Sequence, residues 1–316
     1  MIQMKNVPDR TNTTRRYFLK QAIAGSVSAL AANTIGISPV WANADTEQRI
    51  VIADGALAET ALAMGITPIA MADIAGYRTW IQLPPVPETV ISLGTRFQPN
   101  LERIVLLKPD LILTSGFYAG YYASLRDIAP IETFDIYTRA RSPLENAVAA
   151  AKLIGTLTGQ NDAARKLIAE TFAKFSQIRQ RLAQRDLPPV IVSNLLTSRH
   201  MRVFGQSSLM QAVMDEIGVR NGWNGPTNSW GFATITLTQL AQHTESALMA
   251  FEPVPQNVSR SLDRSPIFTE LPQIRQYGLT RLPPCGTFGG LHSAGRFAEI
   301  LMQCLLDLPS RNGLPS

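Results

Sequence analysis

The sequence predicts an α/β protein built from two lobes that one long helix connects. Short apolar runs alternate with stretches of helical periodicity between residues 49 and 136, and the same alternation returns between residues 190 and 282. A segment with helical periodicity alone, residues 142–184, separates the two regions. Alternating strands and helices are typical of mostly parallel sheets covered by helices. The chain of 316 residues is long enough for two such lobes.

Residues 1–44 have the pattern of a twin-arginine export signal. Arg15 and Arg16 follow Thr14 and precede an aromatic residue, a leucine and a lysine. A short segment rich in Ala, Gly and Ser then leads to Ala42-Asn43-Ala44, a small-x-small cleavage site without a nearby cysteine for a lipid anchor. A membrane anchor or a basic tail is the alternative, but an anchor needs about 20 apolar residues in a row. We therefore expect the twin-arginine translocase to export the chain to the periplasm.

The first lobe is predicted over residues 45–141. Its strands read as continuous apolar runs, which is typical of parallel strands buried on both faces. The strands are expected at 49–54, 69–71, 90–93, 111–114 and 131–136, and the helices at 56–64 and 100–107.

The connecting helix is predicted over residues 142–159. Ser142 can cap its N-terminus, Pro143 suits its first turn, and Glu145 completes a capping box, while Gly159 ends it. At 1.5 Å per residue it would be about 27 Å long, which is enough to lie along both lobes. A helix packed inside one lobe is the alternative.

The second lobe, residues 160–316, begins with another long helix that Asn161 can cap and that extends to about residue 184. Strands are expected at 190–196, 201–204, 247–251 and 279–282, and helices at 208–217 and 294–306. The glycine-rich stretch 286–290 lacks the lysine and the spacing of a phosphate-binding loop, so we predict a turn before the last helix.

Composition and charge argue against several classes of protein. The net charge is +5, but most of it lies in the leader, and no run of Lys or Arg follows residue 44, so a nucleic-acid partner is not expected. The three histidines show no metal-ligand spacing and no Gly-x-Ser-x-Gly motif occurs, so an enzyme is not expected. Export would permit a disulfide between Cys285 and Cys304, and the sequence leaves this open.

Aromatic residues and an arginine follow several predicted strands, at positions that read as loops. Trp80 comes after the second strand, Arg96 after the third and Tyr118 after the fourth. Trp223 and Trp230 occupy a loop rich in Gly, Asn and Pro, although both could instead pack in the core. In parallel α/β folds, residues just past the strands' carboxyl ends line the binding crevice. A planar guanidinium beside aromatic rings suits a rigid, partly apolar ligand that presents paired oxygens.

At these residues the chain resembles the periplasmic iron(III)-hydroxamate siderophore-binding proteins of bacterial ABC importers. The resemblance extends from about residue 49 to the last helix. A block shared with the wider class of binding proteins runs from Asn100-Leu101-Glu102 to Lys108-Pro109-Asp110. The blocks that point to the hydroxamate branch are Tyr77-Arg78-Thr79-Trp80, Leu93-Gly94-Thr95-Arg96, Arg199-His200-Met201-Arg202-Val203-Phe204-Gly205 and Thr227-Asn228-Ser229-Trp230-Gly231.

The resemblance implies a ligand in a shallow cleft between the lobes. Arg96 and Tyr118 would donate hydrogen bonds to the hydroxamate oxygens around the iron, and Trp80, Trp230 and Phe288 would form walls. The siderophore supplies every iron ligand in this family, so the protein is expected to bind no metal directly and to carry no covalent cofactor. The implied function is capture of ferric siderophores in the periplasm and delivery to an inner-membrane ABC permease, with the connecting helix limiting closure.

Departures from the family's pattern suggest a different ligand subset. Gly55 and Gly286 stand where the family typically has pocket tryptophans, and Arg202 stands where it has an apolar residue. We therefore expect a roomier, more polar pocket for a bulkier or more anionic siderophore, with Arg202 among the ligand-binding residues.

The surface expected to dock on the permease also departs from the pattern. Ala123 and Thr238 stand near the positions of the family's docking carboxylates. Either Asp127 or Glu102 substitutes for them, or docking differs.

Two other functions remain as alternatives. A cobalamin or haem ligand would fit the same class of binding protein, and Tyr118 could then be an axial ligand of haem. An exported hydrolase or redox enzyme could use the same leader, but the sequence shows neither a nucleophile–base pair nor a cofactor motif.

Overall fold

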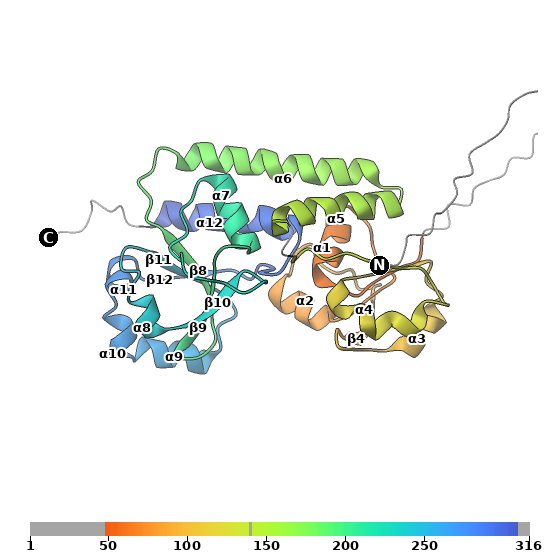
Figure 1. The fold of residues 1–316 in the computed structure, drawn as a ribbon, viewed down its shortest axis with the longest axis horizontal. Helices are drawn as coiled ribbons and strands as arrows, with labels where there is room; N and C mark the ends of the chain where they lie inside the picture. The colour runs from red at the N-terminus through yellow and green to blue at the C-terminus, as the bar shows by residue number, and fades with distance from the viewer. Residues whose placement is uncertain (1–47, 139–140, 309–316) are drawn as a thin grey trace, which may run out of the picture. The chain divides into compact units, whose positions relative to one another are not determined.

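The computed structural model describes residues 48–138 and 141–308, all within one compact unit of the chain (Figure 1). The predicted leader with Arg15 and Arg16 lies outside the described residues. Within them, no helix is long and apolar enough to cross a membrane.

The first lobe is built on a parallel sheet with the strand order β3-β2-β1-β6-β7. All five predicted strands are present, the one at 111–114 with the predicted bounds and the other four shorter, and β1 in the centre is almost inaccessible to solvent. The bounds are β1 (Ile50–Ile52), β2 (Ala70–Met71), β3 (Ile91–Ser92), β6 (Leu111–Thr114) and β7 (Ile131–Thr133).

The helices of this lobe include two α-helices, α2 and α4, and a 3₁₀ helix that the sequence did not predict. The bounds are α1 (Gly55–Ala63), α2 (Ile74–Trp80), α3 (Leu101–Leu107), α4 (Gly116–Tyr122) and the 3₁₀ helix η1 (Ala123–Leu125). The prediction that Trp80 and Tyr118 lie in loops is therefore wrong, because they lie on α2 and α4. Glycine weakens the helical pattern in both segments.

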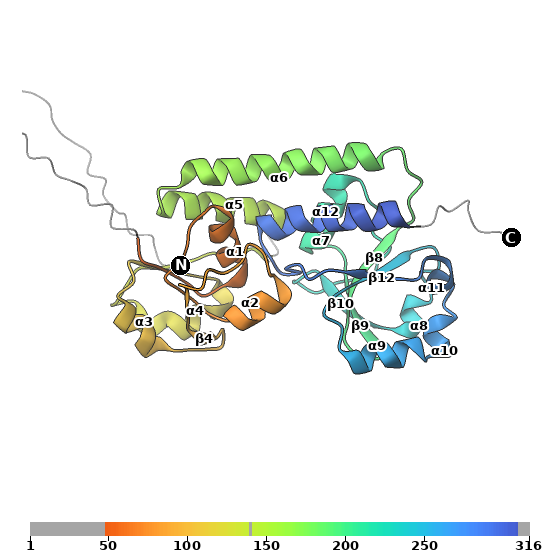
Figure 2. The same cartoon turned by 180° about the vertical axis from the view of Figure 1, so that it is seen from behind.

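Helices α5 (Pro143–Leu157) and α6 (Asn161–Leu182) lie side by side; α6 extends over both lobes, whereas α5 lies over the first lobe (Figures 1 and 2). The predicted capping box of α5 is confirmed, since Ser142 Oγ accepts from Glu145 N at 3.2 Å and the Glu145 carboxylate accepts from Ser142 N. Helix α5 contacts α1 of the first lobe as well as α7 (Leu209–Ile217) and α12 (Leu291–Asp307) of the second. The sequence-based lobe boundaries at 141 and 160 remain predictions.

The predicted cap of α6 is wrong. Asn161 is the first residue of the helix, and the preceding Gln160 makes no capping bond with its side chain. The Asn161 amide oxygen instead accepts a hydrogen bond from the Thr156 hydroxyl at 3.3 Å, so it is turned back toward α5.

The second lobe has a mixed sheet with the order β10-β9-β8-β11-β12. Strands β8, β11 and β12 pair in parallel. At one edge of the sheet, β9 pairs antiparallel with β8, and β10 pairs antiparallel with β9. The bounds are β8 (Val190–Leu195), β9 (His200–Phe204), β10 (Phe232–Thr236), β11 (Ala247–Phe251) and β12 (Leu279–Leu282). The sequence did not predict β10, nor the short helices α8 (Leu237–Leu240), α9 (Gln256–Asp263), α10 (Pro266–Thr269) and α11 (Pro272–Tyr277).

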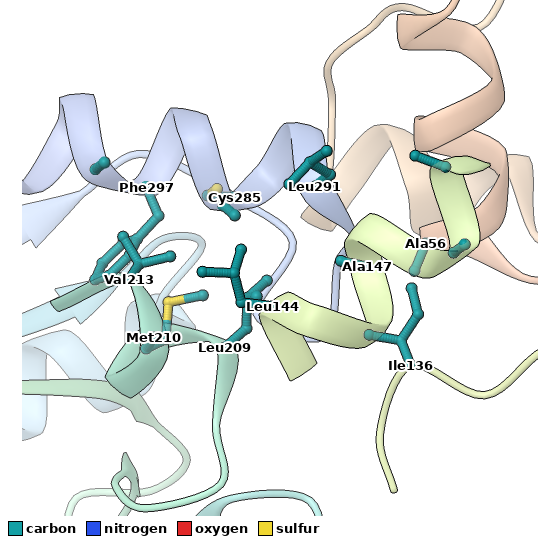
Figure 3. Packing of buried hydrophobic residues seen from close by; sticks show 14 of the residues in the cluster. Ala56, Ile136, Leu144, Ala147, Leu209, Met210, Val213, Cys285, Leu291 and Phe297 are labelled. Carbon is teal, nitrogen blue, oxygen red and sulfur yellow. The ribbon is translucent and has the colours of Figure 1, made fainter. Parts of the chain in front are cut away.

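One apolar core joins the lobes beneath α5. Figure 3 shows Leu144 of α5 between Leu209 of α7 and Leu291 of α12, and Ala147 one turn further along α5, toward Ala56 of α1. Cys285 also lies in this core, and its thiol and that of Cys304 are both free in the structure.

A buried carboxylate links the same elements. Glu59 of α1 is inaccessible to solvent and accepts hydrogen bonds from the Gly290 amide, from Ser293 N at 3.1 Å and from Ser293 Oγ at 2.5 Å. Gly290 cannot cap α12 with a side chain of its own, so Glu59 satisfies the first amides of that helix from the other lobe. The glycine-rich stretch 286–290 is thus the predicted turn before the last helix.

Candidate ligand-binding site

A cavity of about 530 Å³ lies between the lobes, and its lining residues come from both. All six side chains predicted to contact the ligand line it: Trp80, Arg96, Tyr118, Arg202, Trp230 and Phe288. Trp223 does not, because it is only 9% exposed and packs in the core of the second lobe. The sequence left open whether Trp223 and Trp230 line the site or pack in the core; Trp230 lines the cavity, and Trp223 packs in the core.

Arg96 is held at the cavity by a short hairpin. Strands β4 (Gly94–Thr95) and β5 (Gln98–Pro99) pair antiparallel, and Arg96 lies in the turn between them. Its Nε donates to Asp73 Oδ2 at 2.7 Å and its Nη2 lies 2.6 Å from the same oxygen. Its Nη1 donates to Tyr118 Oη at 3.4 Å. The guanidinium is thus oriented from two sides and keeps N–H groups without a partner among the described residues.

Arg96 and Tyr118 both have raised pKa values, for different reasons. Burial acts to lower the pKa of Arg96, but its hydrogen bonds and its attraction to Tyr118 and Asp73 outweigh burial, and the pKa is raised. Burial raises the pKa of Tyr118 despite the hydrogen bond from Arg96. Because Tyr118 accepts from Arg96 through its oxygen, its own O–H remains available as a donor.

Asp73 has two roles that a neighbouring glycine permits. It caps α2 by accepting from Gly76 N at 3.2 Å, and its other oxygen binds Arg96. A Cβ atom at residue 76 would lie 2.5 Å from Asp73 Oδ2, so only glycine lets the carboxylate fold over the helix start. Gly76 also weakens the helical pattern of the sequence, which is why α2 was not predicted.

Asp54 and Asp135 also line this wall, and the sequence analysis missed all three carboxylates. Asp54 caps α1, accepting from Ala56 N at 2.9 Å, and burial raises its pKa. Asp135 accepts from Gly116 N at 2.7 Å at the start of α4. Asp54 and Asp73 follow a strand and precede a helix, which is the N-cap signal that could have identified them.

Aromatic rings connect the two walls. Trp230 stacks on Tyr137 with 5.7 Å between ring centroids and meets Phe288 edge-on at 5.8 Å. Phe117, which is 55% exposed, meets Trp230 edge-on at 5.6 Å from the other lobe. Tyr137 is fixed by a hydrogen bond from its hydroxyl to Gly289 O at 2.8 Å. These rings give the cavity an apolar surface of fixed geometry.

Arg202 lies on the opposite wall, on β9. Its guanidinium carbon stands 4.2 Å from the centre of the Phe232 ring and 5.6 Å from that of Phe288. Burial lowers its pKa, and its Nε is buried without a hydrogen-bond partner among the described residues. Arg96 forms an ion pair with Asp73, whereas Arg202 forms none with any carboxylate of the described residues.

The two glycines that depart from the family's pattern both line the cavity. A Cβ atom at Gly286 would lie 2.6 Å from Ser293 Oγ, and one at Gly55 would lie 3.1 Å from Ile81 Cδ1. Gly286 is therefore required by the close packing around Glu59 and Ser293, and no ring from that position fills the cavity.

Within the described residues, no three His, Cys, Asp or Glu side chains gather in a way that could hold a metal ion. Ala123, Thr238, Asp127 and Glu102 all lie exposed, away from the cavity lining. The predicted docking substitutions remain predictions.

Residues 50–244 match the family model described as periplasmic binding protein. The chain is 31% identical to the iron(3+)-hydroxamate-binding protein FhuD of Escherichia coli over 253 residues, which are 80% of this chain and 85% of that protein. It is 36% identical over 143 residues, 44% of each chain, to the Fe(3+) dicitrate-binding periplasmic protein FecB of Escherichia coli.

Among solved structures, the siderophore-binding protein FhuD from Vibrio cholerae with Fe³⁺-Desferal bound superposes with a TM-score of 0.79 at 26% identity. That match covers 84% of this chain and all of the Vibrio chain. A two-lobed α/β fold, a cavity lined by both lobes and these relatives lead to one conclusion: the chain belongs to the periplasmic binding protein family, whose members bind substrates for transport and are not enzymes.

Proposed function

We propose that this protein binds ferric hydroxamate siderophores in the periplasm and delivers them to an inner-membrane ABC permease. The observation that carries the proposal is Arg96, whose guanidinium is oriented by Asp73 and Tyr118 in a cavity walled by Trp80 and Trp230. A hydroxamate places two oxygens on the iron, and the complex presents them to the protein as acceptors. The relatives that bind iron(III) complexes support the same ligand class.

The proposed roles follow from the geometry of the wall. Arg96 and the Tyr118 hydroxyl donate to hydroxamate oxygens, and such charge-assisted bonds are typically stronger than neutral ones. Trp80, Trp230 and Phe288 cover the apolar linkers of the siderophore. The iron is cargo, and its oxygen ligands belong to the siderophore.

Haem is a weaker candidate for the same cavity. Its iron would need an axial ligand, and no histidine lines the cavity in the described residues. Tyr118 would have to ionise to ligate iron well, whereas burial raises its pKa. Tyr137 is equally unsuited, because burial holds its pKa well above the ordinary value and its hydroxyl is bonded to Gly289 O.

Export by the twin-arginine translocase is part of the proposal and rests on Arg15 and Arg16. A protein that crosses the membrane folded would meet its ligand only outside. The connecting helix α5 and the core it shares with both lobes support a limited closure on binding. Small-angle scattering should show the same radius of gyration with and without ligand, and a large compaction would contradict this part.

Tryptophan fluorescence tests the function directly, because Trp80 and Trp230 line the cavity. We expect quenching by ferric trihydroxamates and none by haem or cobalamin at the same concentration. Arg96→Ala should weaken hydroxamate binding by about 1.5–3 kcal/mol, roughly ten- to a hundredfold. Arg78→Ala on the exposed face of α2 is the matched control and should bind normally. Tight binding by the Arg96 variant would refute the assignment of the site.

A further inference from the structure

The two arginines of the cavity differ in how their charge is compensated. Arg96 is paired with Asp73, whereas Arg202 faces the cavity with no acceptor or carboxylate from the described residues beside it. A half-buried guanidinium without a partner is costly, because burial removes water and nothing replaces it. The unmatched charge therefore points to something that binds in the cavity.

Arg202 is held in place by its neighbours. Stacking at 4.2 Å on Phe232 of β10 fixes the plane of the guanidinium. The carboxylate of Glu252, which also lines the cavity, is engaged elsewhere: it forms an ion pair with Arg281 at 3.2 Å and accepts from Val254 N at 2.5 Å. Glu252 therefore does not neutralise Arg202.

A second polar group lies beside Arg202. Asn194 of β8 is its direct cross-strand partner, so the two side chains project from the same face of the sheet. Both line the cavity. The Asn194 amide makes no hydrogen bond to another side chain or to the backbone within the described residues, so its N–H groups can donate to a ligand group beside Arg202.

We infer that Arg202 and Asn194 form a subsite for a free carboxylate, so that the preferred ligands are ferric hydroxamate siderophores bearing an uncoordinated carboxylate. The inference rests on the proposed function and narrows its ligand class. A planar guanidinium presents two parallel N–H groups that match the two oxygens of a carboxylate, and the amide adds a third donor. Neutral hydroxamates of similar size fill the cavity without satisfying this wall.

Three ferric complexes of desferrioxamine B derivatives test the subsite. The N-succinyl derivative carries a free carboxylate, its methyl ester has nearly the same size without the charge, and the N-acetyl derivative is short and neutral. We expect the native protein to bind the succinyl complex at least about tenfold more tightly than the ester.

Variants assign the preference to residues. Arg202→Met keeps an unbranched apolar chain over Phe232 and should bring the ratio of the two affinities close to one. Asn194→Ala should lower the ratio part of the way, and Arg202→Lys should retain part of it. Arg199→Met, on the exposed turn of the same hairpin, should keep the native ratio. Thermal unfolding checks that each variant is folded.

The outcomes separate the two proposals. Equal affinity of the native protein for acid and ester overturns the carboxylate subsite and leaves the proposed function standing. A native preference that survives undiminished in folded Arg202→Met also overturns it. If none of the three ferric complexes binds, the proposed function fails, and the subsite fails with it.

Discussion

The two lobes meet in two places that differ in how their polar groups are matched. At the junction of α1 and α12, Glu59 satisfies the first amides of α12, and its side chain is fully buried. At the cavity, Arg202 and the free donors of Arg96 and Tyr118 lack protein acceptors in the described residues. The comparison teaches that donors matched within the chain hold the lobes together, while unmatched donors are left for a ligand.

The largest expected effect comes from breaking the junction. Glu59→Ala leaves Gly290 N, Ser293 N and the Ser293 hydroxyl without their acceptor in a buried place, which should lower the free energy of unfolding by about 3–5 kcal/mol. Urea unfolding measures this loss. Glu170→Ala, on the exposed face of α6, is the matched control and should change it by less than about 0.5 kcal/mol. A Glu59 variant as stable as the control would show that the hydrogen bonds of Glu59 do not stabilise the junction between the lobes.

The next largest effect is the response of the junction to pH. Burial raises the pKa of Glu59 from 4.5 to about 7. The folded state therefore holds a proton that the unfolded state releases, and stability from this group is complete below about pH 4.5 and is lost as the pH rises through 7. The linkage of roughly 1.4 kcal/mol per pH unit gives a loss of about 3 kcal/mol across this window.

Glu59→Gln sharpens this test, since the amide resembles the protonated acid. Relative to the native protein, this variant should gain about 3 kcal/mol of stability between pH 4.5 and 7, because it lacks the titrating acid. His292 acts in the opposite direction, because burial lowers its pKa from 6.5 to about 4 and stability from this group rises with pH between those values, but it titrates in both proteins and cancels in their difference. Parallel pH profiles for the two proteins would contradict the assignment of the titration to Glu59.

The smallest effect belongs to the cavity. Tyr118→Phe removes one O–H donor and the acceptor of Arg96 Nη1, which should weaken ferric hydroxamate binding by about 0.5–1.5 kcal/mol. Stability should change little, because the Tyr118 side chain is only partly buried. Titration calorimetry and urea unfolding of the same sample measure both. A large loss of stability with unchanged affinity would show that Tyr118 stabilises the fold, as the junction does, and does not bind the ligand.

Local signals explain why most elements could be predicted. The apolar runs of β1 and β6 and the Ser142–Glu145 capping box are written in neighbouring residues, and the structure confirms them. Helices α2 and α4 were missed because Gly76 and Gly116 make room for Asp73 and Asp135, which lie outside the helices they cap. Strand β10 was missed because its pairing with β9 is not a local property.

The sequence by itself determined the two-lobed α/β class, the helix that joins the lobes and the six side chains that line the cavity. Each depends on periodicity, caps or blocks of residues close together in the chain. Only the tertiary structure decided that Trp230 faces the cavity while Trp223 is buried, that Asp73 compensates Arg96, and that Arg202 has no such partner. Those facts depend on contacts between residues far apart in sequence, which burial and hydrogen bonding select only once the lobes are folded.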